Sequence, residues 1–153
     1  MSDRLDRVSI EQAIADSGRY VSTTCGSSMM PMLRNRRDTV VICKNLERVK
    51  KYDVVLYRTD DGCVLHRAVK VLSDSYVMCG DNRIVLEKGI KDEDIIGVLA
   101  EVYRGEKRIR LDGFKYWTYS RYIVATFYPR RFFRLFRSFL SKKMKKVFCK
   151  SKV

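Results

Sequence analysis

Apolar and polar positions alternate in short runs from residue 19 to about residue 111, and the runs are rich in β-branched and aromatic residues. This pattern is typical of strands rather than helices. Turn-rich segments separate the runs, and Asp60-Asp61-Gly62 is the best candidate for a tight hairpin turn. The sequence therefore predicts a mainly antiparallel β domain over residues 20–113. Its strands are expected at residues 20–24, 39–43, 54–57, 64–72, 76–79 and 95–103.

A short helix is predicted before the first strand. Ser9 followed by Gln12 fits a capping box, and Gly18 is a typical helix stop. Residues 1–19 should therefore form a small helical cover on the β domain.

The last 40 residues have a different composition. Residues 114–153 contain 12 of the 17 aromatic residues and 12 basic residues, but no acidic residue. After Pro129 the apolar residues recur near helical spacing, with arginine and lysine at most other positions. This pattern predicts a basic amphipathic helix. The residues that define the apolar stripe are Phe132, Phe133, Phe136, Phe139, Leu140 and Val147.

The net charge of +14 lies mostly in this tail, since residues 1–113 hold 20 basic and 18 acidic side chains. An anionic membrane surface is the partner that an aromatic, cationic helix of this kind favours. Alternatively, the phenylalanine face packs on the β domain. Nucleic acid is disfavoured because no recognisable reading module accompanies the charge. The sequence does not indicate an oligomeric state.

Five scattered cysteines, an odd number, indicate free thiols rather than a disulfide framework. The N-terminus lacks a signal-peptide-like apolar block, and no run reaches the roughly 18 to 20 apolar residues that a spanning helix needs. We therefore expect a cytoplasmic protein that associates peripherally with a membrane through residues 114–153.

Three segments carry residues suited to acyl transfer. Ser28 lies in a turn before Met29-Met30-Pro31, His66 is the only histidine, and Asp81 lies in Gly80-Asp81-Asn82. A serine hydroxyl needs a base to become nucleophilic, and histidine has a suitable pKa. Taken singly, Ser28 could be an ordinary turn serine, His66 a structural strand residue, and Asp81 a turn carboxylate.

The cysteines offer two other chemistries. Cys63, His66 and Cys79 superficially resemble zinc ligands, but Cys63 and His66 are three apart in a strand and should face opposite sides of the sheet. Cys25 could compete as a nucleophile, although its position favours a buried thiol. No metal and no cofactor are predicted.

In order, the segments are Gly26-x-Ser28-Met29-x-Pro31, residues 52–57, residues 64–67, residues 80–82 and residues 95–98. This ordered set, spread over about half the chain, resembles the superfamily of type I signal peptidases and self-cleaving SOS-repressor peptidases. The resemblance implies their β-rich catalytic fold. It also implies Ser28 as nucleophile and His66 as base, as in the endoplasmic-reticulum type.

Lys70 is the alternative base, but it lies about 13 Å beyond His66 along a strand and would need desolvation to lose its proton. The resemblance implies that Asp81 accepts the other imidazole N–H, with Glu87 as the competing acid. It also implies cleavage after small residues of a peptide bound as an added strand. Some relatives use a hydroxyl two residues before the nucleophile for the oxyanion, where this chain has Gly26.

These observations predict a serine endopeptidase that acts on a peptide or protein substrate, such as a leader segment, through a Ser28–His66 acyl-enzyme near a membrane surface. The anchor segment that signal peptidases place before these boxes is missing, which favours a cytosolic peptidase. The chain before residue 20 is too short for a repressor's DNA-reading domain. The alternative is a non-catalytic β module that binds anionic lipid or nucleic acid through its tail.

Overall fold

Strand β3 (Val54–Thr59) is central to the sheet because its four apolar residues, 54 to 57, are all buried. In this computed structural model the backbone is described for residues 2–150 and the side chains for residues 10–139. β3 pairs antiparallel with β4 (Gly62–Val71) on one side and with β7 (Ile95–Arg104) on the other. A strand with neighbours on both sides and apolar residues on both faces is typical of the middle of a packed sheet.

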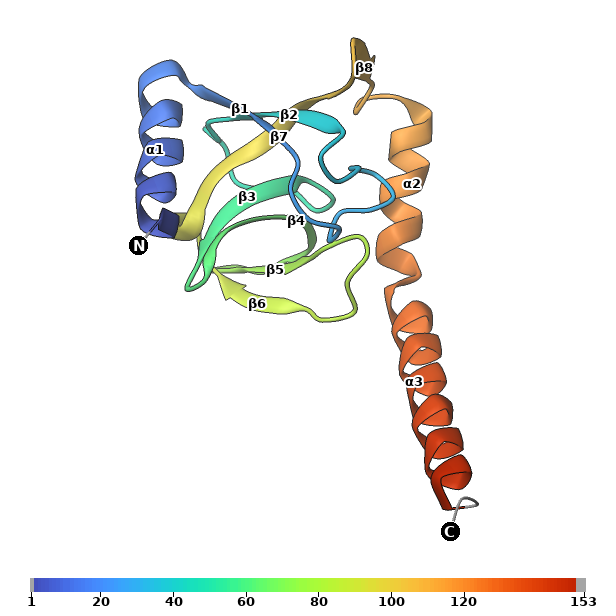
Figure 1. The fold of residues 1–153 in the computed structure, drawn as a ribbon. Helices are drawn as coiled ribbons and strands as arrows, with labels where there is room; N and C mark the ends of the chain where they lie inside the picture. Colours follow the sequence, from blue (N-terminus) through green and yellow to red (C-terminus); the bar gives the residue numbers. More distant parts are fainter. Residues whose placement is uncertain (1, 151–153) are drawn as a thin grey trace.

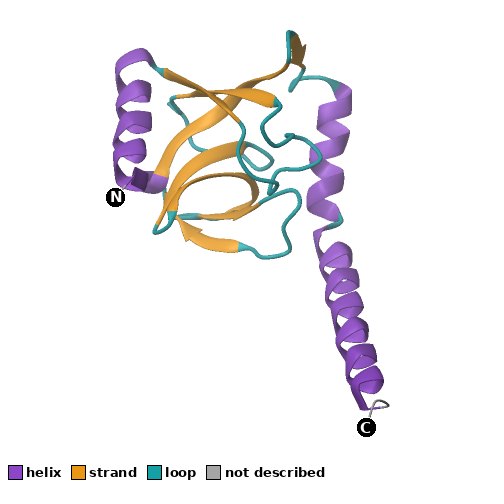
Figure 2. Cartoon of the chain, viewed as in Figure 1, coloured by secondary structure: helices purple, strands orange, loops and turns teal. Residues whose placement is uncertain are grey.

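The described strands form one eight-stranded antiparallel sheet with the order β1-β2-β7-β3-β4-β5-β6, and β8 pairs with β7 (Figures 1 and 2). Helix α1 lies at one side of this curved sheet, and α2 stands at the other. The remaining bounds are β1 (Arg19–Thr23), β2 (Asp38–Cys43), β5 (Tyr76–Cys79), β6 (Glu87–Ile90), β8 (Lys107–Ile109), α1 (Ser2–Ser17), the 3₁₀ turn η1 (Asp92–Asp94), α2 (Phe114–Ala125) and α3 (Phe127–Lys150).

Two apolar clusters pack on opposite faces of the sheet, as the period-2 alternation of side chains requires. Val54 and Leu56 belong to the first cluster, which Ile14 of α1 completes. Val55 and Tyr57 belong to the second, together with Tyr76 and other residues. The mainly antiparallel β architecture predicted from the sequence is confirmed.

All six predicted strands are present, and the hairpin between β3 and β4 has Asp60-Asp61 as its two-residue loop, with Thr59 paired to Gly62. The prediction missed β6 and β8. Both are short edge strands that pair with only one neighbour. Edge strands are often rich in charged residues, and these two have no alternation of apolar and polar residues by which they could be predicted.

The predicted capping box was wrong, because α1 begins at Ser2 and Ser9 lies inside it. No proline or glycine interrupts residues 2–8, so the helix extends past the local cap signal. Its predicted end was right. Gly18 has a φ of 72°, and its N–H donates to the Ile14 carbonyl at 2.9 Å, which is the usual geometry of a glycine after a helix.

The C-terminal region contains two helices rather than one. α2 packs on the β domain through Ser120 and Ile123, whereas α3 extends away from the body (Figure 1). In α3, Phe127 is buried, but Phe132, Phe133, Phe136 and Phe139 are exposed. The alternative in which the phenylalanine face packs on the sheet is therefore wrong for these residues. The predicted stripe residues Leu140 and Val147 lie outside the described side chains.

Within the helices the structure describes, none combines the length and apolar content needed to cross a bilayer.

Candidate active site

Ser28 lies on the loop between β1 and β2, and the segment after β5 holds that loop in place. The Asn82 backbone N–H donates to the Ser28 carbonyl at 2.8 Å, and the Asn82 amide donates to the Ser27 carbonyl at 3.2 Å. The Asn35 side chain accepts from the Gly26 N–H at 2.9 Å. The position of Ser28 is therefore set by hydrogen bonds on both sides of the turn.

Gly80 allows this loop to approach His66 closely. A Cβ atom built on Gly80 would lie 2.7 Å from the Ser28 carbonyl oxygen and 3.0 Å from His66 Cδ2. Any larger residue would have to push the Ser28 loop away. Ser28 and His66 therefore both lie close to Gly80, which explains the glycine of the Gly80-Asp81-Asn82 segment.

His66 lies on β4 opposite Val55, and its imidazole is buried. Its Nδ1 is 3.1 Å from the Tyr57 hydroxyl and 3.1 Å from Glu87 Oε1. The Tyr57 hydroxyl also donates to the other carboxylate oxygen of Glu87. Both partners are on the Nδ1 side, so Nε2, which is bonded to Cδ2, is on the side that faces Gly80 and the Ser28 loop.

The His66 pKa is lowered from its usual value of 6.5, chiefly by burial. Glu87 opposes this by charge and hydrogen bonding and Asp81 by charge, whereas the nearby charge of Arg83 lowers the pKa further. Burial and the Glu87 carboxylate raise the Tyr57 pKa well above its usual range, so the phenol remains a donor. At neutral pH His66 is therefore an unprotonated base held by two polar groups.

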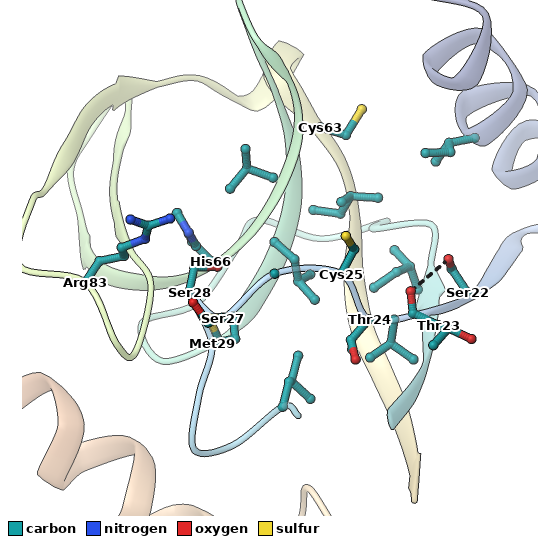
Figure 3. A pocket seen from close by; sticks show the side chains of 18 of the residues that line it. Ser22, Thr23, Thr24, Cys25, Ser27, Ser28, Met29, Cys63, His66 and Arg83 are labelled. Atoms are coloured by element: carbon teal, nitrogen blue, oxygen red, sulfur yellow. Dashed lines mark hydrogen bonds between the residues drawn. The ribbon is translucent and has the colours of Figure 1, made fainter. Parts of the chain in front are cut away.

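Ser28 and His66 line a cleft of about 620 Å³ (Figure 3). Ser28, His66 and Arg83 lie together at one end, and Ser22, Thr23 and Cys63 lie farther along it. The walls come mainly from β1, β2, the loop between them that carries Ser28, and the first half of β4. The other lining residues are Ile10, Tyr20, Thr24, Cys25, Gly26, Ser27, Met29, Leu33, Val40, Ile42, Leu56, Val64, Leu65, Val85 and Glu87.

Asp81 does not make the imidazole contact predicted for it. Its carboxylate accepts two hydrogen bonds from Arg67, at 2.8 Å each, and one from Tyr119 at 2.9 Å. The reason is the strand alternation. Arg67 follows His66 on β4, so the two side chains point to opposite faces, and the partner of Arg67 lies away from Nδ1. Glu87, the competing acid, contacts the imidazole instead.

Lys70 and two cysteines are the remaining candidates with side chains that could act as a base or a nucleophile. Lys70 is exposed and does not line the cleft. Cys25 lines the cleft but is exposed, so the prediction of a buried thiol was wrong. Cys79 is buried, and burial raises its pKa to about 11.

No three acidic, histidine or cysteine residues in the described part of the chain are grouped as metal ligands would be. Cys63 packs against the first apolar cluster, whereas Val55, the strand partner of His66, belongs to the second. The two residues therefore lie on opposite faces, as their spacing predicted. Among the described cysteines, Cys25, Cys43 and Cys79 have free thiols.

Tyr57 and Arg83 are site residues that the sequence analysis missed, and only Tyr57 left a signal in the sequence. A two-residue loop at Asp60-Asp61 pairs Tyr57 with Val64 and Val55 with His66, which puts Tyr57 diagonally next to His66 on one face. The length of a hairpin loop sets the register of its two strands. The predicted turn at Asp60-Asp61 could therefore have placed Tyr57 beside His66.

No protein-family model matches this chain, and no curated protein matches it.

Proposed function

We propose that this protein is a serine endopeptidase of the signal-peptidase-like kind, with Ser28 as nucleophile and His66 as general base. The observation that carries the proposal is the buried His66 imidazole, which has Glu87 and Tyr57 at Nδ1 and the Ser28 loop on its opposite side. A nucleophile, a base and a group that orients the base are the components of this chemistry.

In the proposed reaction, Ser28 Oγ attacks the scissile carbonyl carbon while its proton passes to His66 Nε2. Glu87 stabilises the imidazolium, as a carboxylate on Nδ1 does in other serine hydrolases. The C–N bond then breaks, the amine leaves with the proton from His66, and an acyl ester remains on Ser28. Water attacks the ester with His66 again as base, which releases the acid and restores the hydroxyl.

Two groups are suited to the negative charge that develops on the carbonyl oxygen. The Ser28 backbone N–H makes no hydrogen bond within the described part of the chain. Arg83 is the only arginine or lysine among the residues that line the cleft. An unused N–H and a nearby cation are both favourable for an oxyanion.

Free strand edges on both sides of the cleft support binding of an extended peptide. β1 pairs only with β2, and the first half of β4 pairs with β3 but not with β5, which joins β4 only from Arg67 onward. A substrate strand could add to either edge. The substrate proposed is thus an unfolded segment, such as a leader, and the proposed location is the cytoplasmic side of a membrane surface.

The test is active-site labelling combined with peptide cleavage. Purified protein is treated with a fluorophosphonate probe, and a peptide library is digested and analysed by mass spectrometry. Wild-type protein should form an adduct on Ser28 and produce cleaved peptides, and Ser28→Ala and His66→Ala should lose both. Ser27→Ala is the matched control, since Ser27 is the adjacent residue of the same turn and lines the same cleft. It should retain most activity.

Cleavage that persists in Ser28→Ala, or that is lost only in Cys25→Ala, would refute the proposed nucleophile. The alternative is the non-catalytic module. It is the better description if wild type and Ser28→Ala give the same labelling and cleavage results while substitutions in residues 114–153 change binding to anionic lipid or nucleic acid.

A further inference from the structure

α3 has an unusual orientation, because its charged side faces the protein body. The Arg130 guanidinium donates to the Asp81 carbonyl at 2.7 Å, and that of Arg134 donates to the Asn82 carbonyl at 2.7 Å and to its side-chain oxygen at 2.8 Å. These contacts fix the side of the first turns of α3 that faces the β domain.

The phenylalanine side of α3 must therefore point away from the body. Successive residues of an α-helix are about 100° apart, so Phe132 and Phe136 lie about 160° to 200° from Arg134. In agreement, Phe132, Phe133, Phe136 and Phe139 are between 49% and 65% exposed. Phe132 and Phe136 stack on each other with ring centroids 6.1 Å apart, so their rings form one continuous apolar surface.

Further exposed aromatic residues lie on α2 and at the start of α3. Phe114 and Trp117 stack at 5.9 Å, and Tyr122 and Tyr128 are also exposed. Arg121 lies over the Trp117 ring at 3.8 Å. We call this set the aromatic face: Phe114, Trp117, Tyr122, Tyr128, Phe132, Phe133, Phe136 and Phe139.

The charges beside the aromatic face indicate what covers it. Residues 114–153 contain 12 basic and no acidic residues, and Arg131 and Arg137 are exposed without a hydrogen-bond or ion-pair partner among the described residues. An exposed apolar surface of this size needs a partner, and one flanked only by positive charge favours an anionic one. Tryptophan and tyrosine are also the residues preferred at the boundary between headgroups and acyl chains.

We infer that the aromatic face is an interfacial anchor that inserts into the surface of an anionic phospholipid bilayer, with the flanking arginines at the headgroups. Nucleic acid would bind the arginines and lysines through its phosphates. Such binding would not account for the exposed phenylalanines, which lie on the opposite side of α3 from Arg130 and Arg134. This inference does not depend on peptidase activity.

The anchor has a defined relation to the cleft. Arg134 binds Asn82, and Asn82 donates to the carbonyls of Ser27 and Ser28. Only two hydrogen-bond steps therefore separate the anchor helix from the nucleophile loop. A bilayer bound to the aromatic face would hold the cleft at a fixed position relative to the membrane surface.

The test is flotation of the full chain with vesicles of phosphatidylcholine, with and without about 30% phosphatidylglycerol. Binding should require the anionic lipid and weaken with salt. Phe132→Ser/Phe136→Ser should reduce binding about tenfold or more, since two large apolar side chains are lost from the anchor. Leu46→Ser is the matched control, because Leu46 is the most exposed large apolar side chain outside the aromatic face, and it should bind as wild type does.

A second pair of variants tests the charges without changing the aromatic face. Arg131→Gln/Arg137→Gln should weaken anionic-vesicle binding about tenfold, whereas Lys44→Gln/Lys70→Gln, which removes the same charge from the β domain, should have little effect. Circular dichroism checks that each variant retains its helices.

Three outcomes would overturn the inference. The protein could remain unbound with every vesicle composition. It could bind duplex DNA or RNA with an affinity insensitive to the phenylalanine substitutions. It could also form a dimer that Phe132→Ser/Phe136→Ser dissociates, with no binding to vesicles, in which case a second copy of the chain covers the aromatic face.

Discussion

Two side chains of opposite charge act on the His66 imidazole. Glu87 raises the pKa of His66 by charge and by its hydrogen bond at Nδ1, whereas Arg83 lowers it by charge alone. Burial, the largest effect, also lowers it. Because only the neutral imidazole can accept the serine proton, activity should be lost as the pH falls through the His66 pKa.

The wild-type profile of kcat/KM against pH should therefore have an acid limb below pH 6.5. Glu87→Gln removes a group that raises the pKa, so the limb should move to lower pH. The rate should also fall about a hundredfold, because the imidazolium loses its partner. Arg83→Gln removes a group that lowers the pKa, so its limb should move to higher pH. The profiles are measured with a cleaved library peptide over pH 4 to 9.

Glu47→Gln and Arg37→Gln provide the charge-matched controls, since both residues are exposed and neither lines the cleft. Their acid limbs should coincide with that of wild type. If Glu87→Gln and Arg83→Gln shift the limb in the same direction, or not at all, His66 is not the base.

At the residue scale, the sequence could nominate Ser28 and His66 as candidates but could not choose the acid. Ser28 is nominated by the resemblance, which puts the nucleophile directly before Met29, and His66 is the only histidine. The choice between Asp81 and Glu87 depends on which face of β4 each one reaches. Composition does not show this, although strand alternation could have paired Asp81 with Arg67. A buried arginine requires an acid, and that requirement is met by Asp81.

At the scale of elements, the Arg67–Asp81 pair joins β4 to the segment after β5 and to both C-terminal helices. Both side chains are buried. Tyr119 of α2 donates to the Asp81 carboxylate, and Arg67 donates to the Tyr116 hydroxyl at 3.1 Å. Arg130 of α3 donates to the Asp81 carbonyl. The pair therefore links four elements of the structure.

Asp81→Asn should accordingly reduce stability rather than act directly on the reaction. Removing one partner of a buried ion pair leaves the other charge uncompensated, which costs about 3 to 5 kcal/mol. Urea denaturation measures this change. Asp112→Asn is the matched control, because Asp112 pairs with Arg110 at the surface, where solvent screens the charges, and this variant should unfold close to the wild-type urea midpoint.

A different result would restore the role predicted from sequence. If Asp81→Asn unfolds at the wild-type urea midpoint but loses cleavage activity, Asp81 acts on the reaction and not on the fold.

The element predictions succeeded where apolar alternation was strong and failed where pairing alone defines the strand. β3 begins with a buried apolar run, and β7 is an apolar-rich strand that pairs with neighbours on both sides. β6, with the sequence Glu-Lys-Gly-Ile, becomes a strand only because β5 offers it a free edge. The prediction missed β6, which is the strand that places Glu87 beside His66.

At the scale of the whole molecule, composition and packing disagree about where the β domain ends. The change in composition places a boundary after residue 113. In the structure, however, α2 buries Ser120 and Ile123, α3 buries Phe127, and two tyrosines of α2 contact the Arg67–Asp81 pair. These contacts make α2 and the start of α3 part of the folded body, and only the rest of α3 a projecting arm.

Two truncations separate these descriptions. A chain that ends at residue 136 keeps every described contact of α2 and α3 with the body, so its thermal midpoint should stay within about 3 °C of wild type. A chain that ends at residue 113 loses the burial of Ile123 and Phe127, each worth about 1.5 to 3 kcal/mol, and also exposes the Arg67–Asp81 pair. Its free energy of unfolding, measured with urea, should be lower than that of wild type by about 4 kcal/mol or more. The loop that carries Ser28, which Asn82 holds in place, should also lose its order. Equal stability of the two truncated chains would mean that the β domain folds without α2, and that the boundary after residue 113 is the physical one.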